Sequence, residues 1–285
     1  MSVLSIQKRV AAVHDISCFG RCSLTVALPI LSAAGIETSV IPTAVLSTHT
    51  GGFEGFTYHD LTQDIRPISQ HWQSLGLEFD ALYTGFLGSF EQLEIVSELF
   101  DDFRKKDNLI YVDPVMADNG KLYSIFSPEF PKGMARLCQK ADIILPNMTE
   151  AAFLLGREYR PGPYTKEYVE GLMKDLTAMG PKMAVLTGVS LDGRNLGAAT
   201  YDSATGTTGY AFAPVIEGYY HGTGDVFGSA LLSALLNGFD LTGSAQVAVD
   251  FTVESIQRTK DVGTDIRFGV NFESSIPNLI RNLKL

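Results

Sequence analysis

Short apolar runs alternate with longer helical patterns along most of this sequence. The runs are typical of strands and cover residues 10–13, 37–42, 80–86, 109–115, 142–146 and 183–189. Apolar spacing typical of helices lies between them, as at residues 23–34, 90–106 and 166–179. Residues 109–112 and 143–145 are continuously apolar, as expected for strands that helices cover on both faces. The pattern predicts an α/β fold with a mostly parallel sheet and a functional site at the carboxyl ends of its strands.

The stretch 196–214 has a different pattern, because glycines, threonines and a proline interrupt short extended runs. We expect antiparallel hairpin strands there, at one edge of the sheet. From Asp225 onward the pattern is helical, with an amphipathic segment at 245–260 that Gly263 closes. No linker, repeat or low-complexity tract divides the chain, so we predict a single domain over residues 1–285.

Composition limits the partners that this protein can have. Asp and Glu outnumber Lys and Arg by 32 to 22, which argues against a general nucleic-acid binder. No apolar run reaches the roughly 18 residues of a membrane span, and residues 1–9 lack the apolar core of a signal peptide. Cys18, Cys22 and Cys138 have no zinc-binding spacing, and we expect reduced thiols. These features predict a cytoplasmic enzyme that binds neither nucleic acid nor membrane.

The segment Gly222-Thr223-Gly224-Asp225 precedes a long apolar helical pattern. Two glycines allow a tight turn with accessible N–H groups, and the N-terminus of the following helix adds positive charge. The segment therefore predicts a pocket for an anion such as phosphate, with the Asp225 carboxylate beside it as a base for a hydroxyl group. Ordinary capping of the helix by Asp225 is the alternative, which other parts of a phosphate-transfer site would disfavour.

Further polar groups follow three of the predicted strands. Asp113 precedes Pro114 at the end of one strand, and Asn147 with Glu150 follows the next. Thr187-Gly188 closes a third strand. Each could be structural, as a turn, a helix cap or a bend, but together they are expected to converge on one crevice. Oxygen ligands from Asp113, Asn147 and Glu150 suit Mg²⁺, so the pattern indicates nucleotide-dependent phosphoryl transfer. The Gly-x-x-x-x-Gly-Lys-[Ser/Thr] loop of P-loop enzymes is absent from the sequence.

With these residues, the chain resembles the ribokinase-like superfamily and, within it, the pyridoxal kinase family. The resemblance runs from Val10 to about Thr259. Its most specific marks are Gly222-Thr223-Gly224-Asp225, Asn147-x-x-Glu150, Asp113-Pro114-Val115-Met116 and Ser47-Thr48-His49-Thr50-Gly51. The resemblance implies a three-layer α-β-α sandwich with a mostly parallel central sheet and an antiparallel edge. It also implies an ATP- and Mg²⁺-dependent kinase of vitamin B6 salvage that phosphorylates the 5′-hydroxymethyl group of a B6 vitamer.

The same resemblance assigns roles to individual residues. Asp225 would be the catalytic base, and the amides of Gly222, Thr223 and Gly224 would form the anion hole. Asp113, Asn147 and Glu150 would serve the nucleotide and the metal. Lys121 or Tyr123, on a flap that moves over nucleotide and substrate, would help to exclude water, with an ordinary exposed turn as the alternative. The remaining ATP-site residues would be Thr187 and Gly188, and the substrate contacts would come from Asp15, Ser47, His49, Thr50 and Phe86.

Several points stay open at this stage. His49 could instead be a loop histidine bonded to backbone, and Phe86 stands where the family usually has tyrosine. Asp15 stands where the family usually has a serine in contact with the substrate ring, and its carboxylate could accept from a ring N–H or hydroxyl, or favour the amine of pyridoxamine. A hydroxymethylpyrimidine kinase of the same fold and a non-catalytic B6 carrier are alternative functions. The family precedent is a homodimer, and a requirement for a monovalent cation such as K⁺ is undecided.

Overall fold

The computed structural model describes residues 7–285 and contains a nine-stranded sheet of order β11-β10-β9-β8-β5-β4-β1-β2-β3. The six strands from β9 to β2 pair in parallel, which confirms the prediction of a mostly parallel sheet. These strands are β1 (Arg9–Ser17), β2 (Glu37–Leu46), β4 (Ala81–Thr84), β5 (Leu109–Val112), β8 (Ile143–Ile144) and β9 (Met183–Val189).

Antiparallel strands form both edges of this sheet. β10 (Asn195–Asp202) and β11 (Thr207–Pro214) make the predicted hairpin beside β9. β3 (Tyr58–Asp60) pairs with β2 at the opposite edge and was not predicted, because its three exposed residues carry no apolar pattern. A separate hairpin of β6 (Ala117–Asp118) and β7 (Lys121–Leu122) follows β5.

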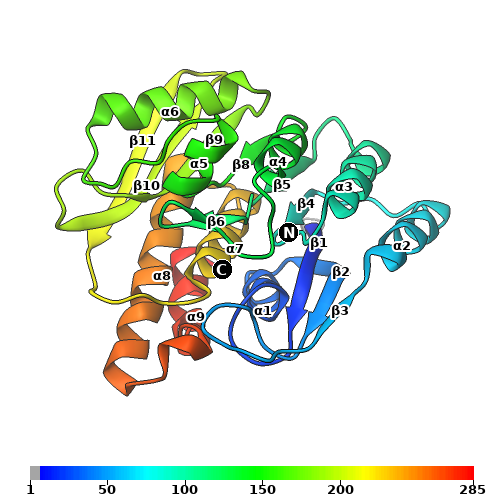
Figure 1. The fold of residues 1–285 in the computed structure, drawn as a ribbon, viewed down its shortest axis with the longest axis horizontal. Coiled ribbons are helices and arrows are strands. Elements are labelled where there is room, and N and C mark those ends of the chain that lie inside the picture. Colours follow the sequence, from blue (N-terminus) through cyan, green and yellow to red (C-terminus); the bar gives the residue numbers. More distant parts are fainter. Residues whose placement is uncertain (1–6) are drawn as a thin grey trace, which may run out of the picture.

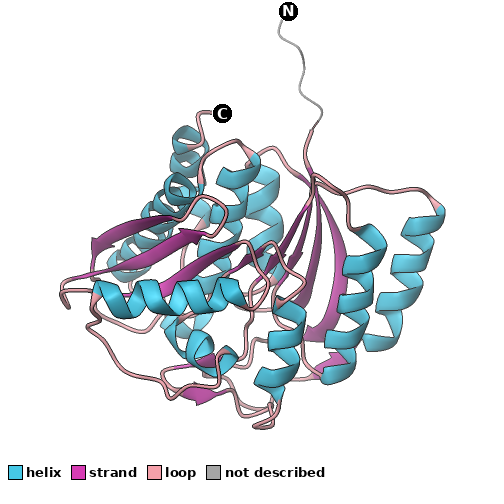
Figure 2. Cartoon of the chain, turned by 90° about the horizontal axis from the view of Figure 1, so that it is seen from above, coloured by secondary structure: helices cyan, strands magenta, loops and turns pink. Residues whose placement is uncertain are grey.

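Helices cover both faces of the sheet, as Figures 1 and 2 show. One layer contains α2 to α6, and the other contains α1, α7, α8 and α9, with neighbouring helices of each layer in contact. The three-layer sandwich is therefore confirmed. The first layer consists of α2 (Thr62–Ser74), α3 (Phe90–Phe103), α4 (Phe130–Cys138), α5 (Met148–Leu154) and α6 (Lys166–Ala178). The second consists of α1 (Leu24–Ala33), α7 (Thr223–Leu236), α8 (Leu241–Val262) and α9 (Ile276–Asn282), with the short 3₁₀ helices Ile266–Phe268 and Glu273–Ser275 before α9.

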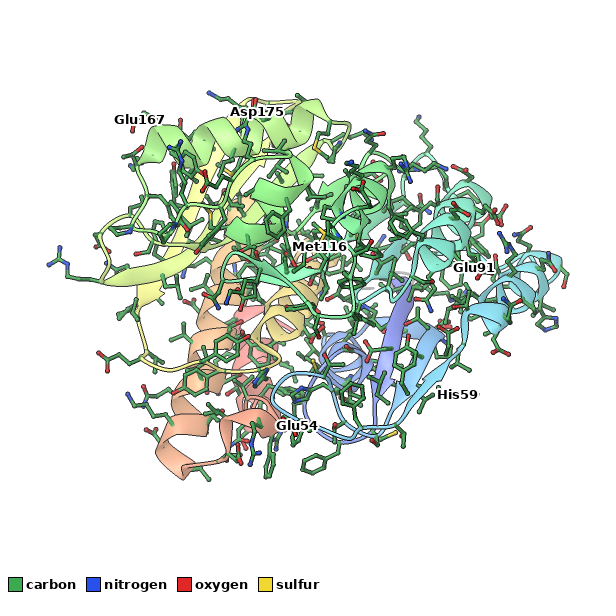
Figure 3. All side chains as sticks on the ribbon, in the orientation of Figure 1. Glu54, His59, Glu91, Met116, Glu167 and Asp175 are labelled. Atoms are coloured by element: carbon green, nitrogen blue, oxygen red, sulfur yellow. The ribbon has the colours of Figure 1, made fainter. Side chains whose placement is uncertain are left out.

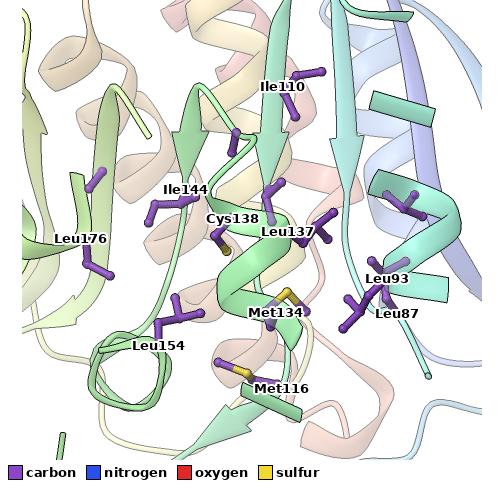
Figure 4. Close-up of a cluster of buried hydrophobic side chains, with 14 of the residues drawn as sticks. Leu87, Leu93, Ile110, Met116, Met134, Leu137, Cys138, Ile144, Leu154 and Leu176 are labelled. Atoms are coloured by element: carbon purple, nitrogen blue, oxygen red, sulfur yellow. The ribbon is translucent and has the colours of Figure 1, made fainter. Parts of the chain in front are cut away.

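Each helical layer shares its own hydrophobic core with the sheet. Leu82 of β4 joins the core under α2 to α6, whereas the next residue, Tyr83, joins the core under α1 and α7 to α9. Burial on both faces explains why the central strands are continuously apolar. Figure 4 shows part of the first core, which includes Ile110 and Ile144 of the sheet and Leu137 of α4. In Figure 3 Glu91 and Glu167 lie at the outer surface, whereas Met116 lies in the interior.

Several boundaries differ from the sequence prediction. The strand predicted over 109–115 ends at Val112, and the one predicted over 142–146 is reduced to Ile143–Ile144, because a proline follows each and donates no N–H to the sheet. α2 and α4 were not predicted, and α2 contains a proline in its interior. No helix among residues 7–285 is long and apolar enough to cross a membrane. The expected lack of a signal peptide concerns residues 1–9, of which 1–6 lie outside the described residues.

The first strand is longer than predicted, and this places Asp15 inside it. β1 continues beyond Val13 to Ser17, and its pairing with β2 shifts register between His14 and Ile16. Asp15 therefore lies at a β-bulge, a kind of irregularity that redirects side chains near functional sites.

Candidate active site

A cavity of about 810 Å³ lies at the carboxyl ends of the parallel strands, where the sequence predicts a crevice. Its wall follows the order of the sheet, from Asp15 in β1 through Asp113 after β5 to Thr187 in β9. The N-terminal segment of α7 also lines it. The predicted site residues that line this cavity are Asp15, His49, Thr50, Phe86, Asp113, Asn147, Glu150, Thr187, Gly188, Gly222, Thr223, Gly224 and Asp225.

Ser47 and Lys121 are the two predicted site residues that do not line the cavity. The hydroxyl oxygen of Ser47 accepts the N–H of Thr57 at 2.9 Å, so this side chain holds its own loop together. Lys121 is exposed on β7. Both residues are close in sequence to residues that line the cavity, but closeness in sequence does not show in which direction a side chain points.

Asp225 lies in the first turn of α7, which begins at Thr223, two residues earlier than the sequence suggested. Its Oδ2 accepts the N–H of Ser23 at 2.8 Å and the thiol of Cys22 at 3.3 Å. Oδ1 accepts no hydrogen bond from residues 7–285, and desolvation by the surrounding protein raises the pKa of the carboxyl group. The N-cap of α7 is Gly222, and no side chain caps the helix. The capping interpretation of Asp225 is therefore wrong, and one oxygen remains available to a ligand.

Gly222 is fixed by close packing against the segment that follows β1. Its φ is 75°, and a Cβ atom there would lie 2.0 Å from the carbonyl oxygen of Arg21. Only glycine tolerates both conditions. Within the described chain, the N–H groups of residues 222–225 donate to no other group, as expected at a helix N-terminus. These N–H groups provide the positive end of a dipole at the cavity wall.

Asn147 and Glu150 form a capping box at the start of α5. Asn147 Oδ1 accepts the N–H groups of Thr149 and Glu150 at 2.8 and 2.9 Å. The Glu150 carboxylate accepts the N–H of Asn147 at 2.9 Å and that of Met116 at 3.1 Å. The structural interpretation of this motif is thus confirmed, and these oxygens are largely occupied by backbone donors.

Asp113 differs from this pair because its carboxylate accepts no hydrogen bond from any other residue in 7–285. Burial, together with the charges of Glu150 and Asp225, raises its pKa well above the usual range. Burial also raises the pKa of Glu150 to about 8. Two buried carboxylates whose charges affect each other, with no Lys or Arg among the described residues that line the cavity, are suited to a cation. No group of three or more His, Cys, Asp and Glu side chains in residues 7–285 could hold a metal ion, so a bound cation would also need phosphate oxygens and water.

Thr187 and Gly188 do not close their strand, because β9 continues to Val189, as the apolar run predicts. Pairing with β10 is irregular at this point, and Gly188 has a φ of 72°. The bulge turns both residues into the cavity wall.

His49 is a backbone-bonded histidine, as the alternative interpretation proposed. Its Nε2 lies 2.6 Å from the carbonyl oxygen of Arg267, and its Nδ1 accepts the N–H of Gly51 at 3.1 Å. This pattern requires a neutral ring with the proton on Nε2, and burial lowers its pKa. Both nitrogens are occupied, so His49 offers a ligand its ring surface, beside Phe53 at 5.0 Å between ring centroids.

Sequence analysis missed several residues of the cavity wall. Tyr219 donates from its hydroxyl to Asp118 Oδ2 at 3.1 Å and so joins the loop before α7 to the β6–β7 hairpin. Beyond β9 the cavity wall is largely apolar. The α8 residues in this wall have the spacing of one helical face, and this spacing was the sequence feature that could have identified them. The residues that were not predicted include Cys22, Ser23, Phe53, Val215, Ile216, Tyr219, Val249, Val253 and Ile256. All three cysteines are free, as expected.

A family model described as phosphomethylpyrimidine kinase matches residues 29–269 of this chain. The chain belongs to this kinase family. It is 33% identical over 183 residues to the hydroxymethylpyrimidine/phosphomethylpyrimidine kinase of Aquifex aeolicus, covering 63% of this chain and 68% of that protein.

Solved structures show the same fold for this kinase. A provisionally assigned phosphomethylpyrimidine kinase from Bacteroides thetaiotaomicron superposes with a TM-score of 0.93 and 38% identity over 98% of this chain and 96% of that one. Another crystal form of that protein was solved with pyridoxal. Pyridoxal kinase from Lactobacillus plantarum superposes with a TM-score of 0.87 and 31% identity, over 97% and 98% of the two chains. The ribokinase-like assignment is confirmed, and both substrate classes occur among the relatives.

Proposed function

We propose that this kinase transfers a phosphoryl group from ATP to the 5′-hydroxymethyl group of a vitamin B6 vitamer, that is, pyridoxal, pyridoxamine or pyridoxine. The observation that carries the proposal is the placement of Asp225, whose free Oδ1 lies beside unpaired backbone N–H groups in the cavity. A base next to an anion site is the arrangement needed to activate a hydroxyl group against a phosphate.

In this reaction Asp225 would accept the hydroxyl proton as the oxygen attacks phosphorus. The N–H groups at 222–224 would neutralise charge on the transferred group. The aromatic rings of His49, Phe53 and Phe86 line the end of the cavity near β1, β2 and β4, and they suit a flat ring. The apolar wall from Val215, Val249 and Val253 at the other end suits the nucleotide base.

Magnesium fits the acidic group at the centre of the cavity. Asp113 would bind it, Glu150 would contribute charge, and Asn147 would hold α5 in place through its cap. When bound, the ion would offset the negative charge of the phosphate groups. We also propose that the protein is cytoplasmic and forms a homodimer. Light scattering of the purified protein would test the homodimer.

Hydroxymethylpyrimidine phosphorylation is the second candidate. The family model and the Aquifex aeolicus relative favour it, whereas the Bacteroides thetaiotaomicron structure with pyridoxal favours a B6 vitamer. Both substrates are flat rings that carry a CH₂OH group. A carrier without activity would not need the open oxygen of Asp225.

The test is consumption of Mg-ATP by the purified protein with pyridoxal, pyridoxamine, pyridoxine or hydroxymethylpyrimidine. We expect turnover of at least one B6 vitamer at a higher kcat/KM than hydroxymethylpyrimidine. Asp225→Asn should lower kcat by roughly 10²–10⁴-fold, the usual contribution of a general base, while calorimetry shows vitamer binding intact. A preference for hydroxymethylpyrimidine would establish the second candidate. Tight vitamer binding without any turnover would instead establish the carrier.

A further inference from the structure

Asp15 is a buried carboxylate with an incomplete set of hydrogen bonds. Its side chain is 4% exposed, and Oδ2 accepts the hydroxyl of Ser17 at 3.2 Å. Oδ1 is buried and has no hydrogen-bond partner in residues 7–285. An unpaired buried charge destabilises the folded state, so such a group is expected where a ligand or a partner supplies the missing hydrogen bonds.

The surroundings of Asp15 make the missing partner a cation. Asp15 lines the cavity at the β-bulge in β1, near the aromatic end formed by His49, Phe53 and Phe86. The titratable groups whose interactions with it are resolved are Asp225, Cys22 and Tyr58, and none of them is positively charged. His49 is neutral in its observed hydrogen bonds. Of the residues that line the cavity within 7–285, none is Lys or Arg.

Asp15 is therefore a buried carboxylate that lacks a cationic partner among the described residues of the cavity. Burial and the charge of Asp225 raise its pKa to about 6, so the carboxylate is still ionised at neutral pH. A protonated amine supplies both a positive charge and several N–H donors, whereas an aldehyde oxygen supplies neither. Hydrogen bonds between charged groups are the strong ones, and burial strengthens them further.

We propose that Asp15 is a specificity-determining residue that binds a protonated amine on the substrate ring, so that the site selects pyridoxamine over pyridoxal. This inference rests on the proposed B6 kinase function and adds the class of substituent that the site prefers. Because Asp15 accepts a proton near pH 6, the preference for the amine declines as the pH falls below that value.

The test compares kcat/KM for pyridoxamine and for pyridoxal in wild type, Asp15→Asn and Glu54→Gln. Asparagine keeps the shape of the side chain and removes its charge. We expect Asp15→Asn to lower kcat/KM for pyridoxamine by roughly 10- to 100-fold, as for a charged hydrogen bond, and that for pyridoxal by less than threefold. Glu54 is an exposed acidic residue of the same cavity wall, so Glu54→Gln controls for overall charge and should leave the ratio between the two substrates unchanged.

Calorimetric binding of both vitamers without nucleotide gives a second readout that needs no turnover. Asp15→Asn should weaken pyridoxamine binding and leave pyridoxal binding nearly unchanged. Equal losses for both vitamers would overturn the role of Asp15, even where turnover of both upholds the proposed function. If wild type phosphorylates no B6 vitamer, the proposed function fails, and the binding ratio alone decides whether Asp15 recognises the amine.

Discussion

At the scale of single residues, the site holds side chains in states that are unfavourable until a ligand arrives. Asp15 and Asp113 are buried carboxylates without a basic partner in the cavity. At Asp225, Ser23 and Cys22 donate hydrogen bonds to one of the carboxylate oxygens, and the other oxygen remains open. The fold thus tolerates local instability in order to keep reactive groups ready.

Asp15→Asn is expected to stabilise the ligand-free protein. The pKa of Asp15 is raised from 3.8 to about 6, so its folded state binds a proton more tightly than its unfolded state. The contribution of Asp15 to the free energy of unfolding is therefore most favourable below pH 4, and this contribution is lost as the pH rises through 6. Roughly 2 pKa units correspond to about 3 kcal/mol. Urea unfolding should show a gain of this order for Asp15→Asn at pH 7.5 and almost none at pH 4, and a loss at pH 7.5 would contradict the argument.

At the scale of elements, the start of α7 depends on one glycine far more than on its neighbour. Gly222 has a left-handed φ of 75° and packs against the carbonyl of Arg21. Gly224 has no left-handed φ, and a Cβ atom there would meet nothing within 4 Å. The two positions therefore form a matched pair for mutation.

Gly222→Ala should destabilise the protein by roughly 1–3 kcal/mol from backbone strain alone, and relief of the clash will displace the start of α7. Its kcat should fall together with its stability. Gly224→Ala should leave the melting temperature unchanged or slightly higher, because alanine adopts this backbone conformation without strain and restricts the unfolded chain. Thermal unfolding monitored by circular dichroism checks both variants, and equal melting temperatures for the two would refute the argument.

Local sequence patterns predicted the elements well where a strand or helix carries its own signal. β9 was predicted with its observed bounds, and α6 within one residue, because apolar spacing and terminal residues mark them. The Asn147-x-x-Glu150 motif likewise identified a helix start. The bonding of His49 could not be predicted, because its partner Arg267 is 218 residues away. The position of Asp15 at a β-bulge depends on the register between β1 and β2, which neither strand shows alone.

At the scale of the whole molecule, charge is unevenly distributed around the site. The chain carries a net charge of −10, and six acidic residues line the cavity. A triphosphate approaching this surface meets repulsion, which the N–H groups of α7 offset only in part. Nucleotide binding is therefore expected to depend on a divalent cation.

Removal of Mg²⁺ with EDTA should weaken ATP binding by at least about 100-fold, a change of roughly 3 kcal/mol. Isothermal titration calorimetry with and without Mg²⁺ measures the effect. Asp113→Asn removes a proposed ligand of the ion, so Mg²⁺ should strengthen ATP binding less in this variant than in wild type. Equal affinity with and without Mg²⁺ in the wild type would show that the N–H groups alone suffice.

The bond between the Ser23 N–H and Asp225 also has a consequence for synthesis on the ribosome. It joins segments 202 residues apart, and the backbone of Arg21 is bonded to that of Phe268 in the same region. Residue 225 must therefore leave the exit tunnel before this bond can form, and residue 268 must leave it before the second bond can form. A nascent chain that has formed β1 to β9 possesses the centre of the sheet but lacks Asp225, so we expect activity to arise only after the residues up to 268 have emerged.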